Sequence, residues 1–200
     1  MHFFINLFGD DNLDIIMIRH GETEDNILKI LSRDDTKLSD RGKEQIKRTR
    51  ELLKDFTFDK VYYSPLGRAK ETLDILGLDG NPDVRIREIN FGIFTGYTYD
   101  ELLEKYPEET KLWLDDPNTY NISEGESLNI VYDRVKNFLE EKAKLDEDIV
   151  LVVHDGIIRL ALCWIFDNPN LFLKFKIDNG SINIISIEDD FKYIKKLNYI

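Results

Sequence analysis

Two runs of apolar residues, each followed at once by a histidine or by an arginine and a histidine, constrain the fold of this chain most. Residues 15–18 (IIMI) precede Arg19 and His20, and residues 149–153 (IVLVV) precede His154. An apolar run without alternation is typical of a strand buried on both faces of a helix-covered parallel sheet. The 200 residues include three histidines. The position of two of them at the ends of such strands predicts that both lie in one site.

Strand and helix patterns alternate along the chain. Strands are predicted at residues 14–18, 58–63, 84–87, 149–153 and 181–187, with an edge strand at 192–197. Helices are predicted at residues 39–56, 65–76 and 126–145, with others after Thr98 and Gly156. This alternation predicts an α/β fold, a three-layer α/β/α sandwich with a mostly parallel central sheet. Ligands bind at the carboxyl ends of the strands in such sheets, where both histidines belong.

Local motifs predict how three of the helices begin. Ser64 fits the N-cap of the helix at 65–76, with Pro65 at its first position. Residues 98–101 and residues 123–126 each fit a capping box, in which the side chains at the two ends exchange hydrogen bonds with the backbone. A smaller role in lining a pocket stays open for Glu126 and Ser127.

Composition predicts one domain over residues 1–200 and restricts its partners. The net charge is −12, so nucleic acid and anionic membrane surfaces are poor partners. The sequence has no apolar stretch long enough to span a membrane. Residues 1–13 form an N-terminal extension of undecided role, and they lack the basic start and cleavage site of a signal peptide. Cys163 has no second cysteine with which to form a disulfide. A cytoplasmic location is therefore expected, and the oligomeric state is left open.

Four segments carry side chains suited to chemistry. His20 is followed by Gly21, which lets the backbone approach a ligand closely. Arg68 falls in the first turn of its helix, where a cation opposes the helix dipole unless an anion binds there. Glu88 lies near two phenylalanines, and apolar surroundings raise a carboxyl pKa, as a general acid requires. His154 is expected to contact the same anion.

Each of these residues also has a structural alternative: a histidine that begins a loop, a solvated helix arginine or an exposed loop glutamate. Arg159 lies within the helix after His154 and is expected to be structural, whereas Asp155 orients a neighbour or caps that helix. Because the predicted topology brings the two histidines, two arginines and Glu88 together, a shared anion site is favoured over the separate alternatives.

The ordered motifs of the chain resemble those of the histidine phosphatase superfamily, which has the phosphoglycerate mutase-like fold. They are RHGETEDN, DTKLSDRG, SPLGRAKET, REINFGIFTG, EGES, VHDGIIR and DNGSI, and they cover residues 14 to about 187. The resemblance implies that His20 becomes phosphohistidine, that Glu88 protonates the leaving oxygen, and that Arg19, Arg68 and His154 hold the phosphoryl oxygens. It adds phosphate contacts from Gly21, Thr23, Asn26, Asp155 and Gly156. It implies no metal and no cofactor.

The same resemblance implies a small phosphate ester as substrate. The segment between Glu88 and Glu126 is short and acidic, which resembles the phosphatase branch, and residues 97–125 are expected to form a cap. The leading hypothesis is a metal-independent phosphomonoester hydrolase. The alternatives are a phosphoglycerate mutase, an α-ribazole-phosphate phosphatase of cobalamin synthesis and a regulatory module that binds a phospho-ligand. Asp25 departs from the family, which often has an aromatic residue at that position.

Overall fold

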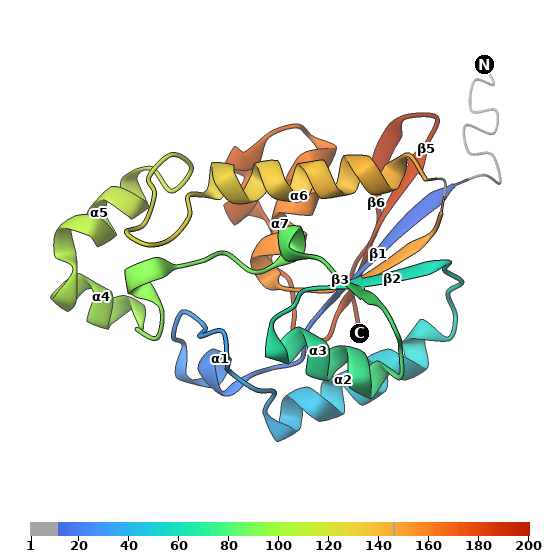
Figure 1. Ribbon diagram of the computed structural model, residues 1–200, viewed down its shortest axis with the longest axis horizontal. Coiled ribbons are helices and arrows are strands. Elements are labelled where there is room, and N and C mark those ends of the chain that lie inside the picture. The colour runs from blue at the N-terminus through green and yellow to red at the C-terminus, as the bar shows by residue number, and fades with distance from the viewer. Residues whose placement is uncertain (1–11, 146) are drawn as a thin grey trace, which may run out of the picture.

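The computed structural model describes residues 12–145 and 147–200, and Figure 1 shows them as a central sheet with helices on both sides. The sheet has the strand order β3-β2-β4-β1-β5-β6. Its strands are β1 (Leu13–Arg19), β2 (Lys60–Tyr63), β3 (Asn81–Pro82), β4 (Ile149–Val153), β5 (Ile182–Glu188) and β6 (Phe191–Tyr199). The α-helices are α1 (Glu24–Leu28), α2 (Asp40–Leu53), α3 (Gly67–Leu76), α4 (Tyr99–Lys105), α5 (Pro107–Asp115), α6 (Leu128–Ala143) and α7 (Asp155–Ile165). Three short 3₁₀ turns complete the list: η1 (Val84–Ile86), η2 (Gly92–Phe94) and η3 (Pro169–Lys174).

The direction of the strands confirms the predicted fold class. Strands β3, β2, β4 and β1 run parallel to one another. Strand β5 pairs antiparallel with β1, and β6 pairs antiparallel with β5. Strand β6 is the predicted edge strand. The four parallel strands all end at the same edge, so the residues that follow them lie close together.

The central strands are apolar throughout because both faces of the sheet are covered. Ile15 and Met17 of β1 belong to a core cluster shared with α6 and α7. Ile16 and Ile18 belong to a second cluster shared with α2 and α3. Side chains alternate between the faces of a strand, so each face buries every second residue. Burial of one such side chain contributes roughly 1.5–3 kcal/mol to stability.

The strand predicted at residues 84–87 is wrong. That segment contains the 3₁₀ turn η1, and the short strand β3 precedes it. The Asp83 carboxylate accepts the backbone N–H of Arg85 at 2.8 Å and thereby caps the turn. An aspartate side chain competes in this way for backbone donors that a strand would need.

Two of the three predicted helix starts are also wrong. Helix α3 begins at Gly67 with Leu66 as its N-cap, and no side chain caps it. Helix α6 begins after Ser127, and the predicted box at residues 123–126 does not form there. The capping box at residues 98–101 is confirmed, since Thr98 and Glu101 exchange hydrogen bonds at the start of α4.

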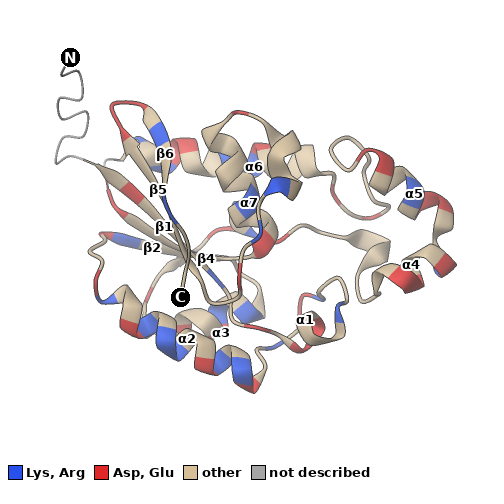
Figure 2. Ribbon diagram, turned by 180° about the vertical axis from the view of Figure 1, so that it is seen from behind, with Lys and Arg blue, Asp and Glu red and all other residues tan. Residues whose placement is uncertain are grey.

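Helices α4 and α5 lie beyond the carboxyl edge of the sheet, at one end of the molecule (Figure 1). They pack around a small cluster of buried residues, Phe94, Leu102 and Ile122. Acidic residues recur on both helices (Figure 2). This is the segment predicted as a cap at residues 97–125. The predicted extension at residues 1–13 lies outside the described residues as far as residue 11, and Leu13 already belongs to β1.

Candidate active site

The two predicted histidines lie side by side at the carboxyl edge of the sheet. Arg19 and Val153 are partners in the parallel pairing of β1 with β4, and His20 donates its backbone N–H to the Val153 carbonyl at 3.0 Å. The ring centroids of His20 and His154 are 5.1 Å apart, with the rings tilted at 63°. Both side chains are buried. The neighbouring strand ends therefore bring the histidines together, as the sequence predicted.

The surroundings of His20 define its protonation. Its Nδ1 lies 2.7 Å from the Gly21 carbonyl oxygen, so Nδ1 carries the hydrogen and donates it. Its Nε2 then accepts the Nε–H of Arg68 at 3.3 Å. Burial, together with the charges of Arg68 and Arg19, holds the pKa of His20 well below its ordinary value of 6.5. A neutral imidazole with a lone pair on Nε2 is the form that a nucleophile requires.

Arg68 is almost fully buried, with 1% of its surface exposed. Its Nη1 donates to the backbone carbonyl of Arg33 at 2.9 Å. Burial lowers its pKa from the ordinary value, and the charge of Glu88 acts in the opposite direction. Arg68 is thus a fixed cation beside His20, in the first turn of α3, where the sequence placed it.

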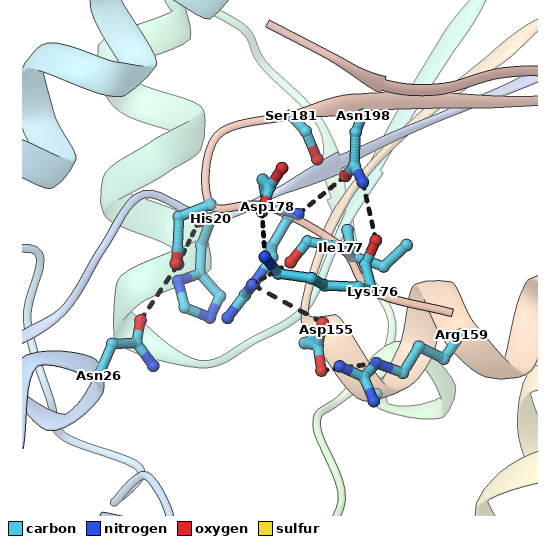
Figure 3. Close-up of polar contacts among 12 residues, drawn as sticks. His20, Asn26, Asp155, Arg159, Lys176, Ile177, Asp178, Ser181 and Asn198 are labelled. Carbon is cyan, nitrogen blue, oxygen red and sulfur yellow. Dashed lines mark hydrogen bonds and ion pairs between the residues drawn. The ribbon is translucent and has the colours of Figure 1, made fainter. Parts of the chain in front are cut away.

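Arg19 is the second cation beside the histidines. Its guanidinium donates to the Ile177 carbonyl and lies 3.7 Å from the Asp155 carboxylate. Asp155 also pairs with Arg159 at 2.8 Å, and Figure 3 shows the two side by side. The loop that supplies Ile177 is held by Asn198, which bonds the backbone on both sides of it (Figure 3). Asp155 contacts arginines, which fits the orienting role considered for it.

Glu88 is the half-buried carboxyl group of the site. It accepts the backbone N–H of Ile89 at 3.0 Å and that of Gly156 at 3.4 Å. Burial raises its pKa, against the lowering effect of the Arg68 charge. A Cβ atom at Gly156 would lie 2.6 Å from Glu88 Oε1, so a glycine is required for this approach. The raised pKa is the property expected of a general acid.

Thr23 and Asn26, both predicted phosphate ligands, form the cap of α1. The Thr23 hydroxyl accepts the Asn26 backbone N–H at 3.2 Å, and Asn26 Oδ1 accepts the Thr23 N–H at 3.1 Å. Asn179 Nδ2 links Asn26 Oδ1 to the His20 carbonyl, at 3.1 and 3.3 Å. Thr23 is buried completely. The structure therefore brings both residues beside His20, and it shows the hydroxyl of Thr23 in a capping bond.

Sequence reasoning missed Ser64 as a residue of the site. Its hydroxyl lies 2.7 Å from Nε2 of His154, and it follows β2 as the histidines follow β1 and β4. That shared place after a strand was a signal for its role. The other ring nitrogen of His154 is buried without a hydrogen-bond partner among the described residues. Burial and the nearby arginines hold the pKa of His154 well below 6.5.

Arg134 on α6 is a second residue that the sequence did not single out. Its guanidinium pairs with Glu126 at 2.9 and 3.0 Å and donates to the carbonyls of Arg85, Arg87 and Glu88. Glu126 also accepts the backbone N–H of Asn90 at 2.9 Å. This network holds the backbone that carries Glu88. The bond partners of Glu126 explain why the predicted capping box at residues 123–126 does not form.

Two general properties concern the described part of the chain. Between residues 12 and 200, with residue 146 left aside, no group of three or more His, Cys, Asp or Glu side chains is arranged to hold a metal ion. Over the same residues, no helix has the length and apolar character needed to cross a bilayer.

Comparisons with known proteins agree with this geometry. The sequence profile of the histidine phosphatase superfamily (branch 1) matches residues 15–200. Phosphoserine phosphatase 1 of Hydrogenobacter thermophilus is 35% identical over 92% of this chain and 91% of its own length. Adenosylcobalamin/alpha-ribazole phosphatase of Escherichia coli is 28% identical over 91% of this chain and 94% of its own length.

Solved structures show the same fold. The alpha-ribazole phosphatase of Shigella flexneri has a TM-score of 0.87 and 26% identity, over 93% of this chain and 96% of that one. The phosphoserine phosphatase of Entamoeba histolytica has a TM-score of 0.82 and 27% identity over the same shares. The predicted enzyme class, a phosphoric monoester hydrolase, is confirmed at the level of the family. The chain belongs to the histidine phosphatase superfamily, branch 1.

Proposed function

We propose that this protein hydrolyses a small phosphate monoester through a phosphohistidine on His20, without a metal ion or other cofactor. The single observation that carries the proposal is the environment of His20 Nε2. This atom belongs to a neutral imidazole, lies 3.3 Å from the Arg68 guanidinium and has His154 beside it. A nucleophile and the cations that would hold its anionic target are therefore in place together.

In the first step, Nε2 of His20 attacks phosphorus, the N–P bond forms, and the bond to the ester oxygen breaks. Glu88, whose pKa is raised by burial, gives its proton to the departing oxygen. Arg19 and Arg68 lie around the position of the phosphoryl oxygens, and His154 supplies a further contact from its ring. Asp155 keeps Arg19 and Arg159 oriented rather than touching the anion, because like charges repel.

In the second step, the ionised Glu88 takes a proton from water, and the water oxygen attacks phosphorus. The N–P bond breaks, inorganic phosphate leaves, and His20 and Glu88 return to their starting forms. The backbones at Gly21 and Gly156 border the two reacting groups, and Asn26 remains a candidate ligand through its amide nitrogen. The cap formed by residues 97–125 would cover the ester during both steps.

The proposal is tested by hydrolysis of p-nitrophenyl phosphate in excess EDTA, with wild type and His20→Ala compared. We expect activity that survives EDTA and is lost in the variant. Rapid quenching after mixing with a phosphorus-labelled ester should trap label on the wild-type protein in an acid-labile, base-stable form. Activity that disappears in EDTA would contradict the proposal, as would a His20→Ala variant that folds normally and keeps its rate.

A mutase is the second candidate within this chemistry. The short segment between Glu88 and Glu126 favours the hydrolase, as do the phosphatase names of the similar proteins. Incubation with 3-phosphoglycerate distinguishes the two, since a mutase would form 2-phosphoglycerate and a hydrolase would release phosphate. A binding module that lacks turnover would instead retain a phosphate ester unchanged. We further propose a cytoplasmic location, on the single cysteine Cys163. We also propose no nucleic-acid or membrane partner, on the net charge of −12.

A further inference from the structure

A cavity of about 260 Å³ borders Glu88, the proposed general acid. Glu88 and Gly156 form part of its wall, so it adjoins the group that would protonate the leaving oxygen. Most of the remaining wall is apolar, including Phe91, Trp113, Leu114, Leu128, Phe172 and Leu173. If the proposed hydrolysis holds, the alcohol part of the ester occupies this cavity.

The charged side chains of this wall are already paired with protein groups. Arg159 is the cation among the lining residues, and it pairs with Asp155 at 2.8 Å and lies over the ring of Phe172. Glu126, also in the wall, pairs with Arg134 at 2.9 Å. A carboxylate on the alcohol part would meet the carboxylates of Glu88, Glu126 and Asp155, and the cation of the wall, Arg159, is already shared with Asp155. The loss of its hydration would then be only partly compensated.

Two large apolar side chains of the cavity wall are exposed at the surface. Leu114 on α5 is 48% exposed, and Leu173 in η3 is 74% exposed. They come from different parts of the chain and border the same cavity. Exposed apolar side chains that converge on one hollow are typical of a site that an apolar group covers on binding.

From these observations we infer that the substrate is a phosphate ester of an uncharged, largely apolar alcohol, rather than of an amino acid or a hydroxy acid. The inference rests on the proposed function and deepens it by naming the class of leaving group. It separates this chain from the relatives named as phosphoserine phosphatases, because the serine part of that ester carries an ammonium and a carboxylate group.

The test compares esters that differ in the leaving group but not in the kind of bond broken. 2-Phenylethyl phosphate, glycerol 3-phosphate and O-phosphoserine are all esters of primary alcohols. We expect kcat/KM for 2-phenylethyl phosphate to exceed that for O-phosphoserine by about 100-fold and that for glycerol 3-phosphate by about tenfold, since apolar contacts and an unpaired buried charge each contribute. Equal kcat/KM values for 2-phenylethyl phosphate and O-phosphoserine, or a higher value for O-phosphoserine, would overturn this inference and leave the proposed function standing.

A pair of variants on α5 tests whether the alcohol part of the ester occupies this cavity. Leu114 lines the cavity, whereas Leu112 does not, and the two have similar exposure, 48% and 52%. Leu114→Asp should lower the ratio of kcat/KM for 2-phenylethyl phosphate to that for glycerol 3-phosphate about fivefold to tenfold, and Leu112→Asp should leave it unchanged. An unchanged ratio in a folded Leu114→Asp protein would overturn the inference. Absence of turnover with every ester, including p-nitrophenyl phosphate, would overturn the proposed function itself.

Discussion

The Nε–H of Arg68 points to Nε2 of His20 across 3.3 Å, so one guanidinium borders the predicted nucleophilic atom and, together with burial, lowers the pKa of its ring. Two further bonds make this relationship rigid. Arg68 donates to the Arg33 carbonyl at 2.9 Å, and His20 donates from Nδ1 to Gly21. The same cation can then hold a phosphoryl group during transfer, which is the kind of preorganisation that lowers a barrier.

Replacement of Arg68 by methionine should lower kcat/KM about 100-fold to 1,000-fold, the cost typical of one lost donor to a developing charge. The pKa of His20 should rise toward its ordinary value because the Arg68 charge lowers it. The acid side of the pH profile of kcat/KM should therefore move to higher pH. Arg68→Lys should recover little, since an ammonium lacks the planar fork. The exposed Arg48 provides the control, and an Arg48→Met variant with a similar loss would contradict this assignment.

Glu88→Gln should remove the general acid while keeping the size of the side chain. We expect kcat/KM to fall about 100-fold or more for an alkyl phosphate, but less than about tenfold for p-nitrophenyl phosphate, whose leaving group needs no proton. The acid form of Glu88 is lost as pH rises through its raised pKa, so kcat/KM of the wild type should decline at high pH. This decline should be absent in the variant. Equal losses for both esters would count against the acid role. Glu108→Gln on α5 serves as control.

Gly156→Ala should displace Glu88. The new Cβ would lie 2.6 Å from Glu88 Oε1 and 2.9 Å from Cδ1 of Ile89. Alanine normally favours a helix by about 1 kcal/mol over glycine, so a loss of activity would report the clash. We expect kcat/KM to fall about tenfold or more, as small misplacements do. A Cβ atom added at Gly67 would meet nothing within 4 Å, so Gly67→Ala should change neither activity nor melting temperature by much. An equal loss of kcat/KM at both sites would contradict the predicted clash at Gly156.

Asp25→Asn should loosen the loop that holds Arg68. The fully buried Asp25 accepts the Arg33 backbone N–H at 2.8 Å and its Nη2 at 2.6 Å. The Arg33 carbonyl in turn accepts from Arg68. We expect the free energy of unfolding in urea to fall by about 1–3 kcal/mol, the cost of weakening the hydrogen bonds of a buried carboxylate. kcat/KM should fall about fivefold to tenfold. Asp74 forms an exposed pair with Lys70, and Asp74→Asn should lower neither the free energy of unfolding nor kcat/KM.

Acidification should destabilise the protein through its two buried histidines. Their pKa values in the folded state lie well below 6.5, so the unfolded chain binds protons first as pH falls through that value. The free energy of unfolding should therefore fall below pH 6.5, by at most about 1.4 kcal/mol per pH unit for each histidine. His154→Asn should remove one of these contributions, measured by urea unfolding at about pH 5.5 and about pH 7.5. The same slope in both proteins would contradict the assignment.

Local patterns were sufficient to predict the sheet and the histidine pair. An apolar run marks a strand buried on both faces, and parallel strands end at one edge, so the residues after β1 and β4 had to meet. The prediction of a strand at residues 84–87 failed because Asp83 competes for the backbone there. The predicted cap for α3 failed because the helix begins only at Gly67, three residues after Ser64, whose hydroxyl bonds His154.

The sequence by itself determined which side chains stand at the strand ends, since the apolar run of a strand and the residue that ends it are local features of the chain. The tertiary structure decided how those side chains are held. Arg134 reaches the backbone of Glu88 from α6, and Asp25 fixes Arg68 through Arg33. The apolar cavity likewise gathers its wall from α5, α6, α7 and η3. Such contacts join segments far apart in sequence, and the partner of a buried polar group depends on which elements pack beside it.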